Sequence, residues 1–146
     1  MKNLPLNHSL IDREKIYMES TYNLSDYMEV PMCVVMLSNN NIQNDRYKKV
    51  LYTLHLQDYS NYRVVFIDDA STDDTLEATK RYAEELGFDS EKIKYKRNNE
   101  QKFATYNLRY AAFDFCKPEE VFVIVDGDDE LIGRYVFKLI SSFYQK

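Results

Sequence analysis

Two groups of acidic residues stand where an apolar run of the chain ends. Asp68 and Asp69 follow the run 63–67, and the sequence Asp126-Gly127-Asp128-Asp129 follows the run 121–125. Carboxylates that converge repel one another and raise each other's pKa unless a cation or hydrogen-bond donors offset their charge. Hard oxygen ligands suit Mg²⁺ or Mn²⁺, and a diphosphate would fill the remaining coordination positions. The two groups therefore predict a divalent-metal site for a phosphate-containing ligand.

A solvated acidic turn is the alternative interpretation of the second group, because Asp-Gly and Asp-Asp pairs are common turn formers. Its position directly after a buried run favours the metal site. Gly127 has no side chain to keep a phosphate or sugar from the backbone. His8 and His55 lack partners at ligand spacing, so we expect neither to bind a metal.

Strands and helices alternate along the chain. Apolar and β-branched runs predict strands over residues 32–37, 63–67, 92–96 and 121–125. A first helix is predicted over residues 45–57, and a second begins at a capping box over 71–74 and ends at Gly87. Helical spacing also marks three sets of residues: Leu76, Lys80, Ala83 and Leu86; Phe103, Asn107, Tyr110, Ala111 and Asp114; and Val136, Leu139, Ile140 and Phe143.

This alternation predicts an α/β fold with right-handed crossovers and a mostly parallel sheet that helices cover on both faces. Such sheets bind ligands at the carboxyl ends of their strands, so we expect the two acidic groups to form one site. Residues 31–146 make up one domain in this prediction. Residues 1–30 are a polar N-terminal extension to which we assign no function.

Composition narrows the classes of function. The chain has 146 residues and a formal net charge of −5, which argues against a nucleic-acid-binding protein, because that function requires Lys and Arg to neutralise phosphates. The longest apolar runs fall far short of the roughly 18 residues that cross a bilayer, so no transmembrane segment is expected. No signal peptide is recognisable at the N-terminus, so a cytoplasmic protein is expected, with peripheral membrane association left open. Cys33 and Cys116 lack CxxC spacing and are expected to be two buried free thiols.

Three blocks of sequence, residues 34–40, 66–73 and 123–129, occur in an order and at a spacing that resemble family 2 glycosyltransferases. The resemblance covers about residues 31–146. It implies a Rossmann-like GT-A fold, a nucleotide-diphospho-sugar donor (a UDP-sugar by preference), Mn²⁺ or Mg²⁺, and transfer of the sugar to an acceptor with inversion. The donor sugar and the acceptor stay open.

The resemblance also assigns roles to individual residues. Asp69 would hydrogen-bond the base, Asp126 would face the ribose, the sugar and the metal, and Asp128 would ligate the metal. Asp129 is a weaker candidate for the same cluster. The remaining donor-binding candidates are Ser38, Asn39, Asp68, Lys102 and Asn107.

Two departures from the family pattern qualify these roles. Ser38-Asn39 stands where the family often has Thr-Tyr or Ser-Tyr, whose ring stacks on the base. Glu100-Gln101 stands where the family usually has one or two glycines, which changes how closely that loop approaches the sugar. A solvated lysine and a helix-face amide remain the alternatives for Lys102 and Asn107.

The general base and the acceptor pocket would lie beyond Lys146 if the chain follows the family. A non-catalytic nucleotide-sugar-binding domain is therefore the first alternative function. A phosphatase of the haloacid dehalogenase type, with Asp126 as nucleophile, ranks last. In that motif Glu130 would occupy a position that requires Thr or Val.

Overall fold

A computed structural model describes residues 28–145, so His8 and most of the predicted N-terminal extension lie outside the described residues. The described part contains one four-stranded sheet in the order β3-β2-β1-β4, with every strand parallel to its neighbour. The strands are β1 (Met32–Ser38), β2 (Tyr62–Asp68), β3 (Ile93–Arg97) and β4 (Val121–Asp126). Each agrees with a predicted strand within one residue at either end. The predicted α/β fold with a parallel sheet is confirmed.

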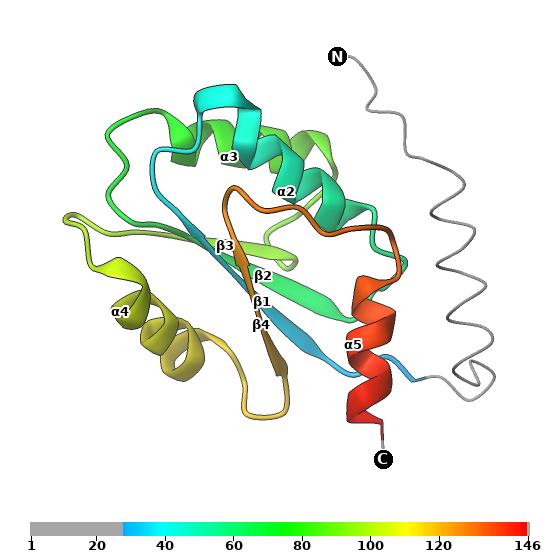
Figure 1. Ribbon diagram of the computed structural model, residues 1–146. Coiled ribbons are helices and arrows are strands. Elements are labelled where there is room, and N and C mark those ends of the chain that lie inside the picture. Colours follow the sequence, from blue (N-terminus) through cyan, green and yellow to red (C-terminus); the bar gives the residue numbers. More distant parts are fainter. Residues whose placement is uncertain (1–27, 146) are drawn as a thin grey trace.

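Helices connect the strands and lie on both sides of the sheet (Figure 1). They are α2 (Arg46–His55), α3 (Thr75–Glu85), α4 (Phe103–Tyr110) and α5 (Val136–Tyr144). The short helix η2 (Gln43–Asp45) precedes α2, and the π-helical turn η3 (Ala111–Phe115) extends α4. No helix among residues 28–145 combines the length and the apolar character that crossing a bilayer requires.

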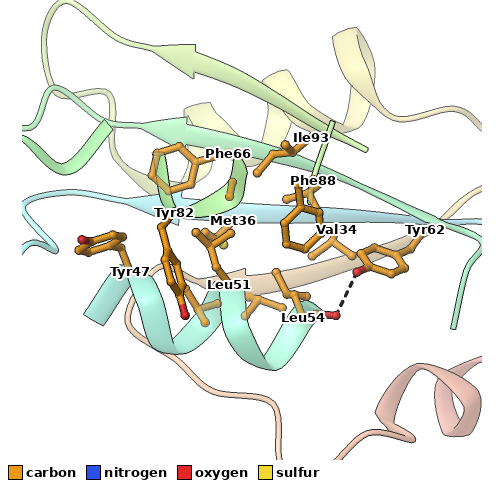
Figure 2. Packing of buried hydrophobic residues seen from close by; sticks show 14 of the residues in the cluster. Val34, Met36, Tyr47, Leu51, Leu54, Tyr62, Phe66, Tyr82, Phe88 and Ile93 are labelled. Carbon is orange, nitrogen blue, oxygen red and sulfur yellow. Dashed lines mark hydrogen bonds between the residues drawn. The ribbon is translucent and has the colours of Figure 1, made fainter. Parts of the chain in front are cut away.

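The larger core lies between the sheet and the helices α2, α3 and α5. Strand residues alternate between the two faces of the sheet, and Met32, Val34 and Met36 of β1 all point into this core. From α2 come Tyr47, Val50, Leu51 and Leu54, which are the residues at helical spacing in the sequence. Figure 2 shows Tyr47, Leu51 and Leu54 in this core, and the Tyr62 hydroxyl donates a 3.0 Å hydrogen bond to the Leu54 carbonyl.

The smaller core lies on the opposite face, under α4 and η3, and contains Val35, Val65, Ile67 and Ala111. This layer covers β1 and β2 but extends less over β4. Phe122 is 36% exposed and Ile124 is 51% exposed, and both stand on this face of the strand. Within the described residues, helices therefore cover the β4 end of this face only in part, which is less than the sequence pattern predicts.

A disulfide joins Cys33 on β1 to Cys116 at the end of η3. The expectation of two free thiols is therefore wrong. The two residues are 83 positions apart, and their Cα atoms are brought to 5.7 Å by the return of the chain from η3 to β4, beside β1. Spacing along the sequence carries no information about such a tertiary approach.

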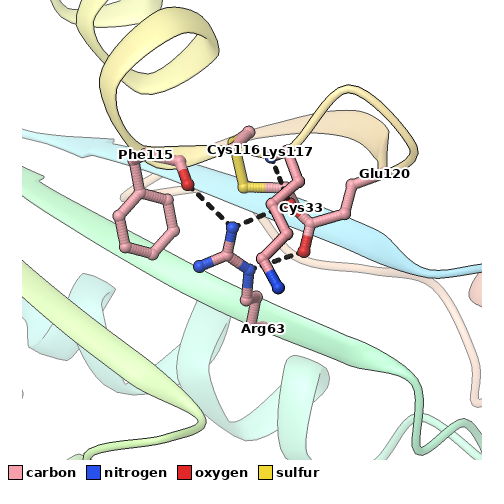
Figure 3. Close-up of a disulfide and its surroundings, with 6 residues drawn as sticks. All are labelled: Cys33, Arg63, Phe115, Cys116, Lys117 and Glu120. Atoms are coloured by element: carbon pink, nitrogen blue, oxygen red, sulfur yellow. Dashed lines mark hydrogen bonds and ion pairs between the residues drawn. A yellow bond between two sulfur atoms is a disulfide. The ribbon is translucent and has the colours of Figure 1, made fainter.

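Arg63 and Glu120 form an ion pair beside the disulfide (Figure 3). The guanidinium donates from Nε at 2.6 Å and from Nη2 at 2.8 Å to the two carboxylate oxygens, and Nη2 also donates to the Phe115 carbonyl at 2.7 Å. Burial alone would raise the pKa of Glu120, but Arg63 and the Lys117 amide outweigh it and lower that pKa. The disulfide and the ion pair together fasten the segment that leads into β4.

The start of α3 differs from the predicted capping box. The helix begins at Thr75, and the Ser71 hydroxyl donates to the Asp68 carboxylate instead of accepting from the helix amides. Asp73 takes the capping role, because its Oδ1 accepts a 3.0 Å hydrogen bond from the Thr75 amide. The other end agrees with the sequence, since Gly87 adopts a left-handed φ of 86° directly after the helix.

Candidate functional site

The carboxyl ends of β1, β2 and β4 lie level at one edge of the sheet. In the strand register Ser38 is opposite Asp68, and Leu37 is opposite Asp126. The first residue after β2 and the first after β4 continue the pairing with β1. The Asp69 amide donates to the Ser38 carbonyl at 2.8 Å, and the Gly127 amide donates to the Leu37 carbonyl at 2.7 Å. Both acidic groups therefore flank the end of the central strand, as the sequence predicts.

Asp68 is completely buried and faces the protein interior. One carboxylate oxygen accepts from the Ser71 hydroxyl and, at 3.3 Å, from the Ser71 amide. The other oxygen lies 3.4 Å from the Arg97 guanidinium but accepts no hydrogen bond. Arg97 therefore balances the charge of the carboxylate without donating a hydrogen bond to this oxygen. Arg97 also donates to the Ser71 carbonyl at 2.8 Å. These contacts hold the loop that follows β2.

Asp69 is 6% exposed and fastens a different loop, the one that enters α4. Its Oδ1 accepts from the Asn98 side chain at 2.7 Å and from the Lys102 amide at 2.8 Å, and its Oδ2 accepts from the Phe103 amide at 2.8 Å. Burial alone would raise the pKa of Asp69, but the Lys102 amide, the Asn98 and Asn107 side chains and the Phe103 amide lower it further than burial raises it. Since α4 has no side-chain cap of its own, the Asp69 carboxylate supplies one from another part of the chain.

Asn98 is the residue of this site that the sequence analysis did not identify. Its side-chain amide donates to the Asp69 carboxylate and, at 2.7 Å, to the side-chain oxygen Oδ1 of Asn107. All three side chains are buried. Asn107 is therefore 1% exposed and belongs to the support of the site. The Lys102 side chain lies outside this network, where it pairs with Glu100. An asparagine two residues after the predicted strand 92–96 was the only signal that could have indicated Asn98.

The loop after β1 is fixed by its asparagines. Asn41 is buried and donates to the Ser38 hydroxyl at 2.8 Å, and the exposed Asn39 donates to the Asp69 carbonyl at 2.8 Å. Asn40 accepts from the Thr72 amide at 2.8 Å. Ser38 is thus turned inward, whereas Asn39 lies on the surface beside the end of β2.

Gly127 fits against the end of β1 because it has no side chain. A Cβ on this residue would lie 2.7 Å from the side-chain nitrogen Nδ2 of Asn41. It would lie 2.8 Å from both the Leu37 carbonyl oxygen and the Ser38 Cβ. The space that the missing side chain leaves at Gly127 is therefore occupied by β1 and its loop. The acidic residues on either side of Gly127 are held at that edge as a result.

Asp126 is the last residue of β4, and Asp128 and Asp129 follow it in the turn directly after the strand. Burial raises the pKa of Asp126, and the negative charges of Asp129 and Asp128 raise it further. A cation beside these carboxylates would relieve that repulsion. Magnesium-type sites take one or two protein carboxylates together with substrate phosphates and water, a requirement that Asp126 and Asp128 are able to meet. The donor set therefore fits Mn²⁺ or Mg²⁺.

No ready-made metal cage stands at this turn in the described residues. Across residues 28–145, the one set of three potential ligand atoms within 4.8 Å of one another belongs to Cys33, Cys116 and Glu120, and its two sulfurs are bonded to each other. A hollow of about 490 Å³ lies near the opposite end of the sheet, lined by residues that include Tyr62, Phe88 and Lys92. Its lining contains none of the predicted site residues.

A parallel α/β sheet of this kind typically binds its ligands at the carboxyl ends of the strands, where these carboxylates gather. The comparison with protein families identifies the class of protein. The model of glycosyl transferase family 2 matches residues 33–146, which is more than half of the chain. The chain belongs to this family. This membership excludes the haloacid-dehalogenase alternative.

Solved structures with the same fold come from distant proteins. S. aureus TarS 1-349 has a TM-score of 0.62 and 23% identity over 77% of this chain and 32% of its own. A Pyrobaculum calidifontis mannosyltransferase, solved in complex with GDP-Man and Mn²⁺, has a TM-score of 0.67 and 19% identity over 96% of this chain. This chain spans 42% of that mannosyltransferase.

A second structure of TarS 1-349 is a complex with UDP, and it matches with a TM-score of 0.57 and 21% identity. The chain covers 31% of that protein's length. Identities this low establish a shared fold. A comparison with curated proteins finds no match.

Proposed function

We propose that the chain binds a nucleotide-diphospho-sugar through a divalent cation and forms the donor side of a glycosyltransferase. The convergence of the two acidic groups at the end of β1 is the observation that carries the proposal. Two structural neighbours, one solved in complex with GDP-Man and Mn²⁺ and the other with UDP, support it from outside the chain. The donor we favour is a UDP-sugar, as the sequence analysis does.

In this proposal Asp126 and Asp128 hold Mn²⁺ or Mg²⁺, with Asp129 beside them. The cation would neutralise the charge that develops on the departing diphosphate. Asp126 also faces the ribose and the sugar.

Asp69 addresses the base. A carboxylate offers about four acceptor positions. Asp69 uses three of them for Asn98, Lys102 and Phe103, which leaves one for a base N–H.

In this proposal the other predicted donor-binding residues form two groups, those on the surface and those that support the site from within the fold. Asn39 and Lys102 lie on the surface, where they are able to contact the donor. Ser38, Asp68 and Asn107 are buried and act by positioning the loops that carry the contacts. Transfer with inversion to an acceptor hydroxyl, assisted by a general base outside the residues assigned here, completes the proposal.

We also propose a cytoplasmic site of action, which the Cys33–Cys116 bond makes testable. Disulfides persist mainly in oxidising compartments and are rare in the cytosol, so this bond is an observation against the proposed compartment. Alkylation of unbroken cells followed by mass spectrometry of the isolated chain separates the two cases. Two alkylated cysteines would support the cytoplasm, and a protected pair would contradict it.

The proposal is tested by calorimetric titration of the chain with UDP and with GDP, in Mn²⁺ and in excess chelator. We expect binding only with the cation, because the acidic turn otherwise repels a diphosphate. Asp126→Asn and Asp128→Asn should each abolish the effect of the cation on nucleotide affinity. Asp69→Ala should weaken the binding of a free nucleoside, which has no diphosphate. Equal affinity with and without chelator would contradict the proposal.

Asp126→Asn carries its own control for misfolding. A carboxyl whose pKa is raised in the folded state adds stability only at low pH and loses that contribution as the pH rises through the raised value. Removing the charge should therefore leave the melting temperature at neutral pH unchanged or higher. Lost binding with an intact melting transition would assign the effect to the site.

A further inference from the structure

Two basic residues of α2 form ion pairs with the acidic turn after β4, although the helix and the turn are far apart in sequence. Arg46 Nη1 lies 3.6 Å from Asp128 Oδ2, and Lys49 Nζ lies 3.4 Å from Glu130 Oε1. Arg46 and Lys49 are three residues apart and so share one side of the helix. The buried side of α2 is formed by other residues, beginning with Tyr47 and Val50. The solvent-facing side of α2 is therefore a basic surface directed at the turn.

The pair between Arg46 and Asp128 is able to open. Its side chains are 45% and 48% exposed, and ion pairs of this kind add little to stability because water screens them. A cation that binds Asp128 competes directly with Arg46 for the same carboxylate. The released guanidinium would then stand beside the metal without its partner.

Charge balance indicates where the released guanidinium goes. The turn holds four carboxylates, those of Asp126, Asp128, Asp129 and Glu130. One divalent cation cannot neutralise all four and a diphosphate as well, so the bound donor requires further positive charge nearby. The planar fork of an arginine matches phosphate oxygens in two places at once, which an ammonium does not.

We infer that Arg46 is a donor-binding residue that exchanges partners, contacting Asp128 in the free chain and the diphosphate in the donor complex. Lys49 is not displaced in the same way, because its partner Glu130 is assigned no metal ligation. This inference rests on the proposed metal and donor site and adds to it a residue and the ligand group it binds, the diphosphate of a nucleoside diphosphate.

Arg46→Ala tests the exchange because its two predicted effects have opposite signs. Mn²⁺ alone should bind a few-fold more tightly, since the competitor for Asp128 is gone. UDP or GDP at saturating Mn²⁺ should bind roughly ten- to a hundred-fold more weakly, since a charge-assisted hydrogen bond to phosphate is lost. Both affinities come from calorimetry of the full chain, with a thermal melt to verify folding.

Two further variants sharpen the result. Arg46→Lys keeps the charge but not the fork, so its diphosphate affinity should fall between wild type and Arg46→Ala. Arg81→Ala is the matched control, because Arg81 of α3 also forms an exposed ion pair, at 3.3 Å from Asp74, which directly precedes the helix. It should leave both affinities unchanged.

The outcomes separate the inference from the proposed function. Unchanged diphosphate affinity in Arg46→Ala would overturn the inference while leaving the metal site in place. Equal weakening of Mn²⁺ and diphosphate binding would also overturn it, because Arg46 would then only shape the turn. Wild-type chain that binds neither Mn²⁺ nor a diphosphate would overturn the proposed function itself.

Discussion

At the scale of single residues, Asp69 and Asp126 each stand at the carboxyl end of a parallel strand, yet their surroundings act on them in opposite directions. Asp69 accepts three hydrogen bonds from the loop that enters α4, and its pKa is lowered. Asp126 has acidic neighbours and partial burial, and its pKa is raised. The first carboxylate stabilises the fold when charged. The second is held in a charged site at a cost, as ligand-binding residues often are.

Asp69→Asn should lower the free energy of unfolding at neutral pH by about 1–3 kcal/mol, because the amide cannot accept from all three donors. The contribution of Asp69 is present above its ordinary pKa of 3.8 and is lost as the pH falls through its lower folded value. The difference between wild type and variant should therefore shrink as the pH is taken down to about 2. Urea unfolding across this range measures it.

Asp74→Asn provides the comparison for that series, since the Asp74 side chain is 66% exposed and pairs only with exposed Arg81. We expect a change of no more than about 0.5 kcal/mol. A constant difference between wild type and Asp69→Asn at every pH would show that the ionised carboxylate is not what stabilises the loop.

At the scale of elements, the acidic turn depends on its close packing against β1. Gly127→Ala should lower stability by about 1–3 kcal/mol, because the new methyl group overlaps backbone and Asn41 atoms that cannot all move. It should also weaken Mn²⁺ binding, because the turn that carries Asp126 and Asp128 is displaced. Denaturant unfolding and calorimetry give the two quantities.

Gly87→Ala is the control for the glycine effect. Gly87 has a φ of 86° but open space around its Cβ position, so alanine there costs about 1 kcal/mol of backbone strain and nothing at the site. If Gly87→Ala and Gly127→Ala reduced Mn²⁺ affinity equally, the close contact with β1 would not be what positions the turn.

The disulfide is the second feature at this scale. It joins β1 to the end of η3 over 83 residues, so it restricts the unfolded chain strongly. Cys33→Ala with Cys116→Ala should lower the free energy of unfolding by about 2–4 kcal/mol. The ion pair of Arg63 and Glu120 should keep the segment in place, so Mn²⁺ binding is expected to survive in the double variant. Unchanged stability would mean that the bond does not form in solution.

The elements themselves were largely predictable, and the reason is visible in particular residues. Val34, Val35, Phe66 and Ile67 are buried and lie in short continuous apolar runs, which are typical of a strand buried on both faces. The π-helical turn over residues 111–115 was not predictable, because its residues fit a regular helical spacing equally well. The role of Ser71 was also missed, since its capping pattern in sequence is the same whether its hydroxyl faces the helix or Asp68.

The site was predictable as a position more than as a set of contacts. That Asp68, Asp69 and Asp126 meet follows from parallel strands ending at one edge. The partners of Asp69 did not follow, because the loop with Asn98 and Lys102 reaches it from 29 and 33 residues away through tertiary contacts. Burial of Asp68 and the position of Arg46 likewise depend on packing that no local pattern encodes.

At the scale of the whole molecule, donor binding should be separable from transfer. The residues assigned to the site either contact the donor or position the loops that do. The chain spans 32% and 42% of the two solved proteins compared above. We expect little or no transfer to added sugar, lipid or protein acceptors, with slow hydrolysis of the donor as the residual activity. Loss of general-base assistance alone costs roughly 10²–10⁴ in rate.

A radiolabelled-donor assay over a panel of acceptors measures this, with hydrolysis and transfer products separated. Robust transfer by residues 1–146 would place the general base within this chain. Asp129 and Glu130 would then be the first residues to substitute.

The first and last residues of the described chain contact each other, which determines where the chain can be tethered without covering the site. The Val30 amide donates to the Ser141 hydroxyl at 3.2 Å, and the Gln145 side chain donates to the Met28 carbonyl at 2.6 Å. Residues 28–30 and the end of α5 thus lie side by side at the amino end of β1 (Figure 1). A tether at the carboxy-terminal end would leave the opposite edge of the sheet facing solution. Surface-immobilised chain should therefore report the same nucleotide affinity as chain free in solution.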